Sequence, residues 1–218
     1  MANDKQLKYQ KALYYEIFNK EEYWFLKKDI LSAKLVFDIW GHVGYFSEWC
    51  RKYNKDAEIY FFEPVKSSFN QAKETLWNDD KIKLFNCWIS NKSEKSTLLL
   101  NQDKTMQSSK FSSFLNPNWI PEKVNFITLK DVVKSNHINS IDVVKIDIEW
   151  MEFEVLNNLE QTIWNKINTL AIEVHLLNND LENQWKILFQ KLQSEFPKNE
   201  IIRSPYTDKI FLSYSTRT

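Results

Sequence analysis

Acidic side chains end several of the apolar runs in this sequence. Asp38 and Glu63 each stand at the end of a short apolar run, and Asp147 and Glu149 end another. If these runs are parallel strands, their carboxyl ends meet at one edge of a sheet, where ligands bind. Glu63 also follows Gly44 by 19 residues, close to the ~20 expected for an acid that hydrogen-bonds ribose. The spacing predicts a site for a ribose-containing cofactor.

The loop after Asp38 narrows the choice between a dinucleotide and S-adenosylmethionine, which both carry a ribose. The chain turns through Gly41 and Gly44 into an amphipathic stretch, without the third glycine of G-x-G-x-x-G. The Asp38 carboxylate would repel a pyrophosphate, which needs bare backbone N–H groups, but suits an ammonium and a sulfonium. We therefore expect S-adenosylmethionine, and a nicotinamide-dependent oxidoreductase is the weaker alternative.

Alternating segments would position these residues. The patterns predict strands over residues 34–39, 58–62, 82–89, 96–100, 124–128, 141–148 and 169–175. They predict helices over residues 45–53, 67–77, 130–135, 151–159 and 181–196. Residues 1–33 are expected to form a helical extension, residues 101–121 a long loop, and residues 200–203 and 209–214 a terminal hairpin. This alternation is typical of a mainly parallel sheet covered on both faces.

Composition excludes several classes of protein. Lys plus Arg equal Asp plus Glu at 29 each, so no nucleic-acid partner is expected. The two cysteines lack metal-ligand spacing, and no apolar run approaches the ~18 residues of a membrane span. No metal is expected, because no His or Cys stands near Asp147, Glu149 and Glu152 in the sequence. A soluble, cytoplasmic protein is the expectation.

Four segments resemble motifs of the FkbM-type methyltransferase family. Residues 140–156 are similar to its "iDllKiDvEGaEfevL", and residues 36–47 to its "viDiGaniGyfS". Glu63-Pro64 resembles its "fEP", and residues 127–131 resemble its "tLdd". The motifs occur in the family's order over about residues 20–175.

The resemblance implies a fold, an activity and a cofactor. The fold is an α/β, Rossmann-like class I methyltransferase, with a mainly parallel seven-stranded sheet and a C-terminal antiparallel hairpin strand over residues 34–218. The activity is methyl transfer from S-adenosylmethionine, usually to a hydroxyl oxygen. We expect the acceptor to be a hydroxyl on a sugar or another small metabolite.

The resemblance also implies roles for individual residues, because each motif position of the family matches a residue of this sequence. The resemblance assigns the cofactor loop to Asp38, Trp40, Gly41, His42 and Gly44, the ribose to Glu63, the adenine to the segment of Trp88 and Ser90, and the methionine moiety to Asp147. Glu149 and His175 are the candidate general bases at the ends of neighbouring strands. Alternatively, His175 is a structural histidine and Glu149 caps the next helix or binds a lysine. Lys145 is expected to pair with an acid rather than to take part in the chemistry.

Two glycines of the family motifs, at positions 40 and 150, are tryptophans here. The chain has only two glycines and nine tryptophans, whereas glycine usually makes up about 7% of a chain. We hypothesise that UGA codons that specify glycine have been read as tryptophan at these positions. Alternatively the tryptophans are genuine, the indole at position 40 fills the adenosine site, and the protein is a non-catalytic binding module.

Overall fold

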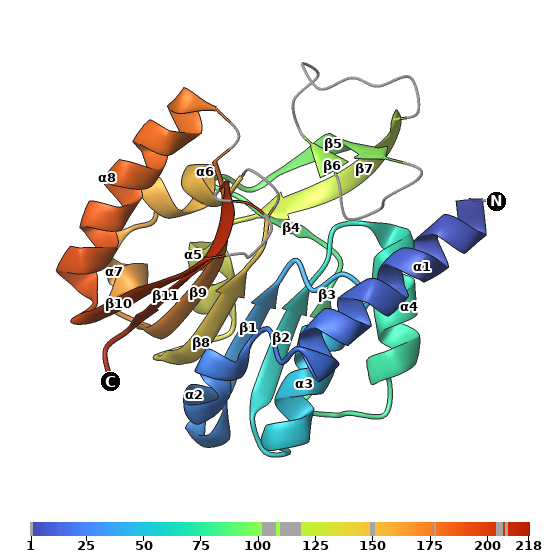
Figure 1. Cartoon of the computed structure of the whole chain (residues 1–218), viewed down its shortest axis with the longest axis horizontal. Helices are drawn as coiled ribbons and strands as arrows, with labels where there is room; N and C mark the ends of the chain where they lie inside the picture. Colours follow the sequence, from blue (N-terminus) through green and yellow to red (C-terminus); the bar gives the residue numbers. More distant parts are fainter. Residues whose placement is uncertain are drawn as a thin grey trace.

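A seven-stranded, mostly parallel sheet forms the centre of the molecule (Figure 1). The computed structural model describes residues 2–101, 108–109, 119–148, 151–176, 178–203, 207 and 209–218. The strands follow the order β10-β11-β9-β8-β1-β2-β3, in which β9, β8, β1, β2 and β3 run parallel and β11 is antiparallel to β9. The predicted sheet and its antiparallel C-terminal strand are confirmed.

The central strands are β1 (Leu35–Ile39), β2 (Glu58–Phe62), β3 (Ile82–Phe85), β8 (Ile141–Ile146), β9 (Ile167–His175), β10 (Lys198–Arg203) and β11 (Ile210–Thr216). The α-helices are α1 (Ala2–Tyr14), α2 (Lys27–Ser32), α3 (Tyr45–Tyr53), α4 (Lys66–Leu76), α5 (Leu129–Ser135), α6 (Glu152–Asn157), α7 (Gln161–Trp164) and α8 (Asn179–Glu195). Two short helical segments, η1 (Tyr15–Asn19) and η2 (Trp24–Leu26), lie between α1 and α2. No helix in these described ranges is both long and apolar enough to cross a membrane.

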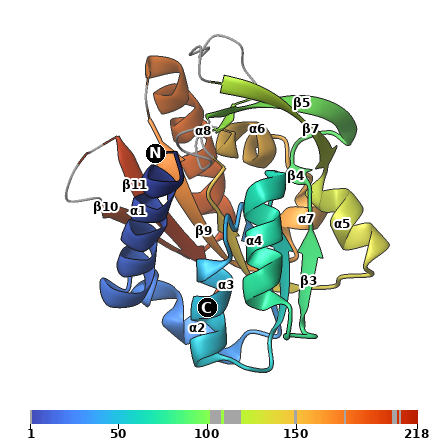
Figure 2. The same ribbon diagram turned by 90° about the vertical axis from the view of Figure 1, so that its right-hand side faces the viewer.

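Each strand sends alternate side chains into two separate apolar layers, as its pleat requires. Val36 packs in a layer with α2, α3 and the segment before them, whereas Phe37 packs in the layer with α5 to α8. Figure 2 shows α1, α3 and α4 on one side of the sheet and α5 and α7 on the other. Because both faces are covered, the central strands are apolar on both sides.

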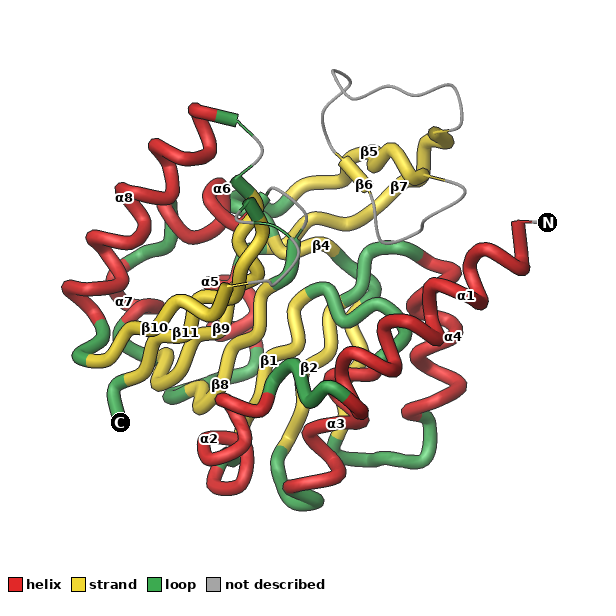
Figure 3. The backbone as a smooth tube through the Cα atoms, viewed as in Figure 1, coloured by secondary structure: helices red, strands yellow, loops and turns green. Residues whose placement is uncertain are grey.

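A second, four-stranded sheet was not predicted. Its order is β4-β7-β5-β6, formed by β4 (Trp88–Ile89), β5 (Glu94–Asn101), β6 (Ser108–Ser109) and β7 (Trp119–Ile127). Figure 3 shows β5 and β7 beyond the ends of β1 and β2. The sheet therefore borders the edge at which the site residues were expected.

The strand predicted over residues 82–89 is divided between the two sheets. Asn86 interrupts it, because its side-chain amide donates hydrogen bonds of 2.8 and 3.1 Å to the carbonyls of Glu63 and Pro64. The strand predicted over 124–128 is the end of the longer β7. Parts of the loop predicted over 101–121 belong to β5, β6 and β7, and the rest of it lies outside the described residues.

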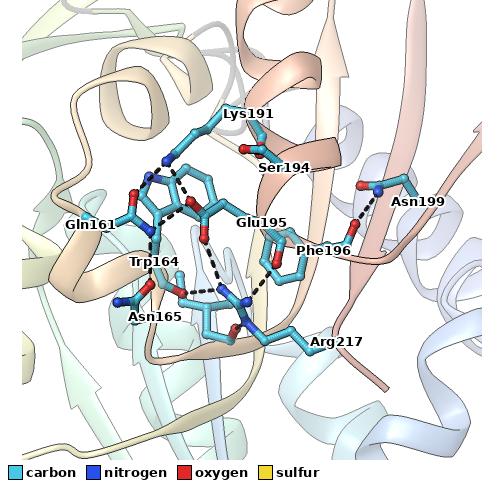
Figure 4. A network of polar contacts seen from close by, with 10 residues as sticks. Gln161, Trp164, Asn165, Lys191, Ser194, Glu195, Phe196, Asn199 and Arg217 are labelled. Atoms are coloured by element: carbon cyan, nitrogen blue, oxygen red, sulfur yellow. Dashed lines mark hydrogen bonds and ion pairs between the residues drawn. The ribbon is translucent and has the colours of Figure 1, made fainter.

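Arg217 fixes the C-terminal end of the chain beneath α7 and α8 (Figure 4). Its guanidinium donates to the carbonyls of Ile167, Trp164 and Glu195 at 2.6–3.1 Å. It also lies 3.3 Å from the Glu195 carboxylate and over the Phe196 ring. One planar group with several donors thus satisfies carbonyls from three elements.

We expect Arg217→Lys to destabilise the fold by roughly 1–3 kcal/mol, because an ammonium cannot reach all three carbonyls. Urea unfolding monitored by tryptophan fluorescence measures the change. Arg203→Lys, on the exposed side of β10, is the matched control and should alter stability by less than about 0.5 kcal/mol. Equal effects of the two substitutions would contradict this role of Arg217.

Candidate active site

Lys145 is a buried cation between two acids. It lies in β8, beside Asp38 of β1 in the parallel register. Its Nζ lies 3.6 Å from Asp38 Oδ1 and 3.6 Å from Asp147 Oδ2, and it donates a 2.9 Å hydrogen bond to the Trp40 carbonyl. The expected pairing of Lys145 with an acid is confirmed. Asp38 also accepts a 2.7 Å hydrogen bond from Ser47 Oγ at the start of α3.

The charge states of these groups depend on one another. Burial alone would lower the pKa of Lys145, but Asp147 and Asp38 raise it above its ordinary value, so the ammonium stays charged. Burial raises the pKa of Asp38 despite the opposing influence of Lys145 and Ser47. For Asp147, burial is outweighed by Lys145 and by a hydrogen bond with Glu173, and its pKa falls. Lys145 and Asp147 therefore form an ion pair, with the Asp38 carboxyl group beside it.

The loop between β1 and α3 has the backbone of a glycine-rich turn. Trp40 and His42 adopt positive φ angles of 63° and 51°, and Gly44 has a φ of 92°. A Cβ at Gly41 would lie 2.1 Å from the Phe61 ring, so only glycine fits there. Of the three residues with positive φ in this loop, only Gly44 is a residue that adopts the conformation cheaply.

Glu63 holds this loop against the end of β2. Its Oε2 accepts a 2.9 Å hydrogen bond from the His42 N–H, and its Oε1 accepts one of 2.8 Å from the Val65 N–H. The side chain is fully buried, and burial raises its pKa well above the ordinary value. Both oxygens thus bind backbone in this structure, and contact of Glu63 with a ribose stays a prediction.

Two tryptophans meet beside the loop. The Trp40 indole is only 3% exposed, and its ring centre lies 4.4 Å from that of Trp88 in an edge-to-face contact. Trp88 also stacks on Phe126 of β7. The structure thus brings together the residue that the resemblance assigned to the cofactor loop and one assigned to the adenine. Their rings occupy the space between the loop and the second sheet.

Ser90 and Cys87 flank Trp88 on either side along the chain. Ser90 is buried, and its N–H donates a 2.9 Å hydrogen bond to the Ile127 carbonyl. Cys87 lines an open groove of about 620 Å³ beside β3 and β7. Neither Trp40 nor Glu63 lines this groove, so it lies next to the cofactor loop rather than in it.

His175 and Asp147 come together at the ends of β9 and β8. Ligand atoms of Asp147, Glu173 and His175 all lie within 4.8 Å of one another. Glu152, fully buried at the start of α6, accepts a 2.9 Å hydrogen bond from the His175 backbone N–H, and its Oε1 lies 3.4 Å from His175 Nδ1. The predicted site residue Glu149 lies outside the described residues, as does Trp150.

Sequence reasoning missed Glu173. The register pairs Ile146 with Ile172, so Glu173 lies across from Asp147. Glu173 and His175 are two residues apart in one strand, a spacing that places both on one face. The sequence did contain a signal for Glu173. Residues 169–175 were predicted as a strand, and the alternation of faces along a strand places Glu173 on the same face as His175.

The segment before α2 also reaches this acidic edge. Burial, followed by the charges of Glu16 and Asp147, raises the pKa of Glu22 to about 7. Tyr23 is buried, and burial together with Glu22, Asp147 and Glu173 raises its pKa well above 10.0. The N-terminal segment thus contributes side chains to the site as well as covering the sheet.

The pH dependence of stability should report the burial of His42. Burial and the nearby Lys145 lower its pKa from 6.5 to about 4. Between these values the unfolded chain binds a proton at His42 that the folded chain does not, so stability falls as the pH falls from 6.5 toward 4. The contribution is roughly 3 kcal/mol over this window. We expect His42→Asn to reduce this slope, measured by urea unfolding across the window.

His137→Asn is the matched control, because His137 is exposed and has a similar φ of 54°. Asparagine tolerates this backbone region at both positions. The control should leave the slope unchanged. Parallel stability curves for the His42 variant and the unsubstituted chain would show that the buried imidazole does not titrate as described.

The fold is that of known methyltransferases. A candidate methyltransferase from Streptococcus mutans, solved in complex with SAH, matches with a TM-score of 0.54 and 8% identity over 88% of this chain and 95% of that chain. The METTL16 MTase domain matches with a TM-score of 0.54 and 11% identity over 91% of this chain and 68% of that chain. At these identities the similarity concerns the fold alone.

Sequence comparison identifies the family. The 31-O-demethyl-FK506 methyltransferase FkbM of Streptomyces tacrolimicus is 22% identical over 191 residues, covering 75% of this chain and 74% of that protein. The family model described as the methyltransferase FkbM domain matches residues 38–198. This range begins at Asp38 and includes the cofactor loop, Glu63, Asp147 and His175. The chain therefore belongs to the FkbM methyltransferase domain family.

Proposed function

We propose that this chain, with glycine at position 40, transfers a methyl group from S-adenosylmethionine to a hydroxyl of a sugar or another small metabolite. The observation that carries the proposal is the partly buried acidic edge. Asp38, Asp147 and Glu173 gather there near the ammonium of Lys145. An excess of carboxylates suits a ligand that carries both an ammonium and a sulfonium.

The names of similar proteins agree with this choice. The Streptococcus mutans structure contains SAH, the product that remains when S-adenosylmethionine has lost its methyl group. The Streptomyces relative is named for a 31-O-demethyl substrate, which is an oxygen acceptor. Both features support the proposed reaction in this family member, and the identity of its acceptor is our inference.

The reaction needs positioning and one proton acceptor. The acceptor oxygen attacks the methyl carbon, the carbon–sulfur bond breaks, and its electron pair stays on sulfur, which becomes a neutral thioether. The hydroxyl proton passes to a base, for which Glu149 and His175 are the candidates. Holding oxygen, methyl carbon and sulfur in line supplies much of the acceleration.

A second function is favoured by one observation. The Trp40 indole is buried against Trp88 in the loop that the family uses for the cofactor. If Trp40 and Trp150 are genuine, the loop is closed by the Trp40 indole, which packs against Trp88. The chain would then act as a non-catalytic binding module with a methyltransferase fold.

Trp40→Gly separates the two functions. Glycine adopts the positive φ of residue 40 at little cost and removes the indole, so we expect SAH to bind at least about tenfold more tightly, a change of about 1.4 kcal/mol. Calorimetric titration measures the affinity, and the SAH-dependent shift in Tm confirms binding to the folded chain. Trp40→Gly/Trp88→Gly should bind at least as well.

Trp77→Gly is the matched control, since Trp77 is 71% exposed after α4. It should leave SAH affinity unchanged. Equal, tight binding by the unsubstituted chain and its Trp40→Gly variant would refute obstruction by the indole. The coding DNA checks the origin of the residue: UGG at codons 40 and 150 would rule out misread glycine codons.

The role of His175 is testable in the background of the Trp40→Gly variant. There, His175→Asn should lower kcat by about 10²–10⁴-fold, the usual contribution of a positioned base, with little change in SAH affinity. Labelled S-adenosylmethionine with a panel of sugar and lipid hydroxyl acceptors provides the assay. His137→Asn is the exposed control. An unchanged kcat for the His175 variant would remove this residue from the mechanism.

A further inference from the structure

We propose that Asp147, Glu173 and His175 form a site for a divalent metal ion of the Mn²⁺ type. The fold assembles this group from the ends of β8 and β9. In the sequence, Glu173 and His175 lie more than twenty residues after Asp147, which is why only the local acids were weighed as ligands. Two carboxylates and one imidazole are a donor set that divalent transition metals accept.

The spacing of the donors fits a coordination sphere. Their ligand atoms all lie within 4.8 Å of one another. Donors on opposite sides of an ion at about 2.0–2.6 Å are about 4–5 Å apart. All three can therefore bind one ion after small rotations of the side chains.

Glu152 lies beside the imidazole, where metal-binding histidines usually have a carboxylate. Its Oε1 lies 3.4 Å from His175 Nδ1 and accepts from the His175 backbone N–H. A ligating histidine usually directs its other ring N–H to a carboxylate, which fixes the tautomer and the ring orientation. With its ring N–H at Nδ1, His175 would bind the metal through the unprotonated Nε2.

The second oxygen of Glu152 is a separate sign of unbalanced charge. Glu152 is fully buried, and its Oε2 has no hydrogen-bond partner in the part of the chain that the structure describes. A buried carboxylate without full hydrogen bonding is costly. A cation bound to His175 would polarise the Nδ1–H toward Glu152 and offset this cost.

The surrounding charge also favours a cation. Lys145 is the cation that pairs with Asp147, and it is shared with Asp38. Glu22 adds a carboxyl group that interacts with Asp147. Asp147 thus has carboxyl groups of Asp38, Glu22 and Glu173 around it, and a second positive charge is accommodated.

The catalytic use of the ion rests on the proposed methyl transfer, whereas its binding does not. A divalent ion lowers the pKa of a hydroxyl that it binds. His175 would then act by holding the ion, and Glu149 would take the proton of the acceptor.

Mn²⁺ titration of the full chain, without cofactor, tests the site through the EPR signal of free Mn²⁺. We expect one saturable site from which Mg²⁺ displaces Mn²⁺. Glu152→Gln should weaken Mn²⁺ binding by about 10–100-fold, the usual effect of a partner outside the coordination sphere. Glu173→Gln, which removes a ligand charge, should weaken it at least as much.

Glu200→Gln is the matched control, because Glu200 lies exposed in β10 and pairs with Lys198. It should leave Mn²⁺ affinity unchanged. Far-UV circular dichroism checks folding, and Glu173→Asp, which withdraws the carboxylate by one methylene, replaces the Gln variant if that variant does not fold. Absence of saturable Mn²⁺ binding, or equal binding by the Glu173 and Glu200 variants, would overturn the site.

The same proteins separate this inference from the proposed function. SAH binding by the Trp40→Gly variant, measured by calorimetry, tests the cofactor. If SAH binds and Mn²⁺ does not, the proposed metal site is refuted and the proposed function is not affected. If Mn²⁺ binds and SAH does not, the metal site is supported and the proposed methyl transfer is refuted.

Discussion

The buried ammonium of Lys145 determines the arrangement of the whole site. It connects the end of β1 through Asp38, the end of β8 through Asp147 and the loop between β1 and α3 through the Trp40 carbonyl. Buried charges of one sign are tolerated only when a partner of the other sign is present. The acids can therefore gather at this edge because Lys145 lies between them. The loop is held at the same place, because the Trp40 carbonyl accepts a hydrogen bond from the Lys145 ammonium.

Much of the central sheet could be predicted from the sequence because its inner strands are largely apolar runs, each ending in an acid or a turn. The second sheet could not. Its strands are short or polar, and β4 follows β3 so closely that only the hydrogen bonds of Asn86 separate them. Local patterns do not show which distant segment a polar strand will pair with.

The candidate site was predictable in part for a similar reason. Asp38, Glu63 and Asp147 were found because each ends an apolar run, and parallel strands bring such ends together. Whether Glu173 and Glu152 belong to the site depends on which face of β9 meets α6. That is decided by tertiary packing, which the local sequence does not show. Glu22 could not be predicted as a site residue, because nothing in the sequence of residues 1–33 shows which part of the sheet they cover.

The two edges of the central sheet also affect how the molecule behaves in a crowded solution. β10 and β3 are the outer strands, and an outer strand offers unpaired backbone groups to any other strand. β10 carries the exposed charges of Lys198, Glu200 and Arg203, and β3 carries Lys83. Charged edges disfavour sheet-to-sheet pairing between copies. Local charge at these two strands, rather than net charge, which is zero for the chain, therefore provides its protection against aggregation through the sheet.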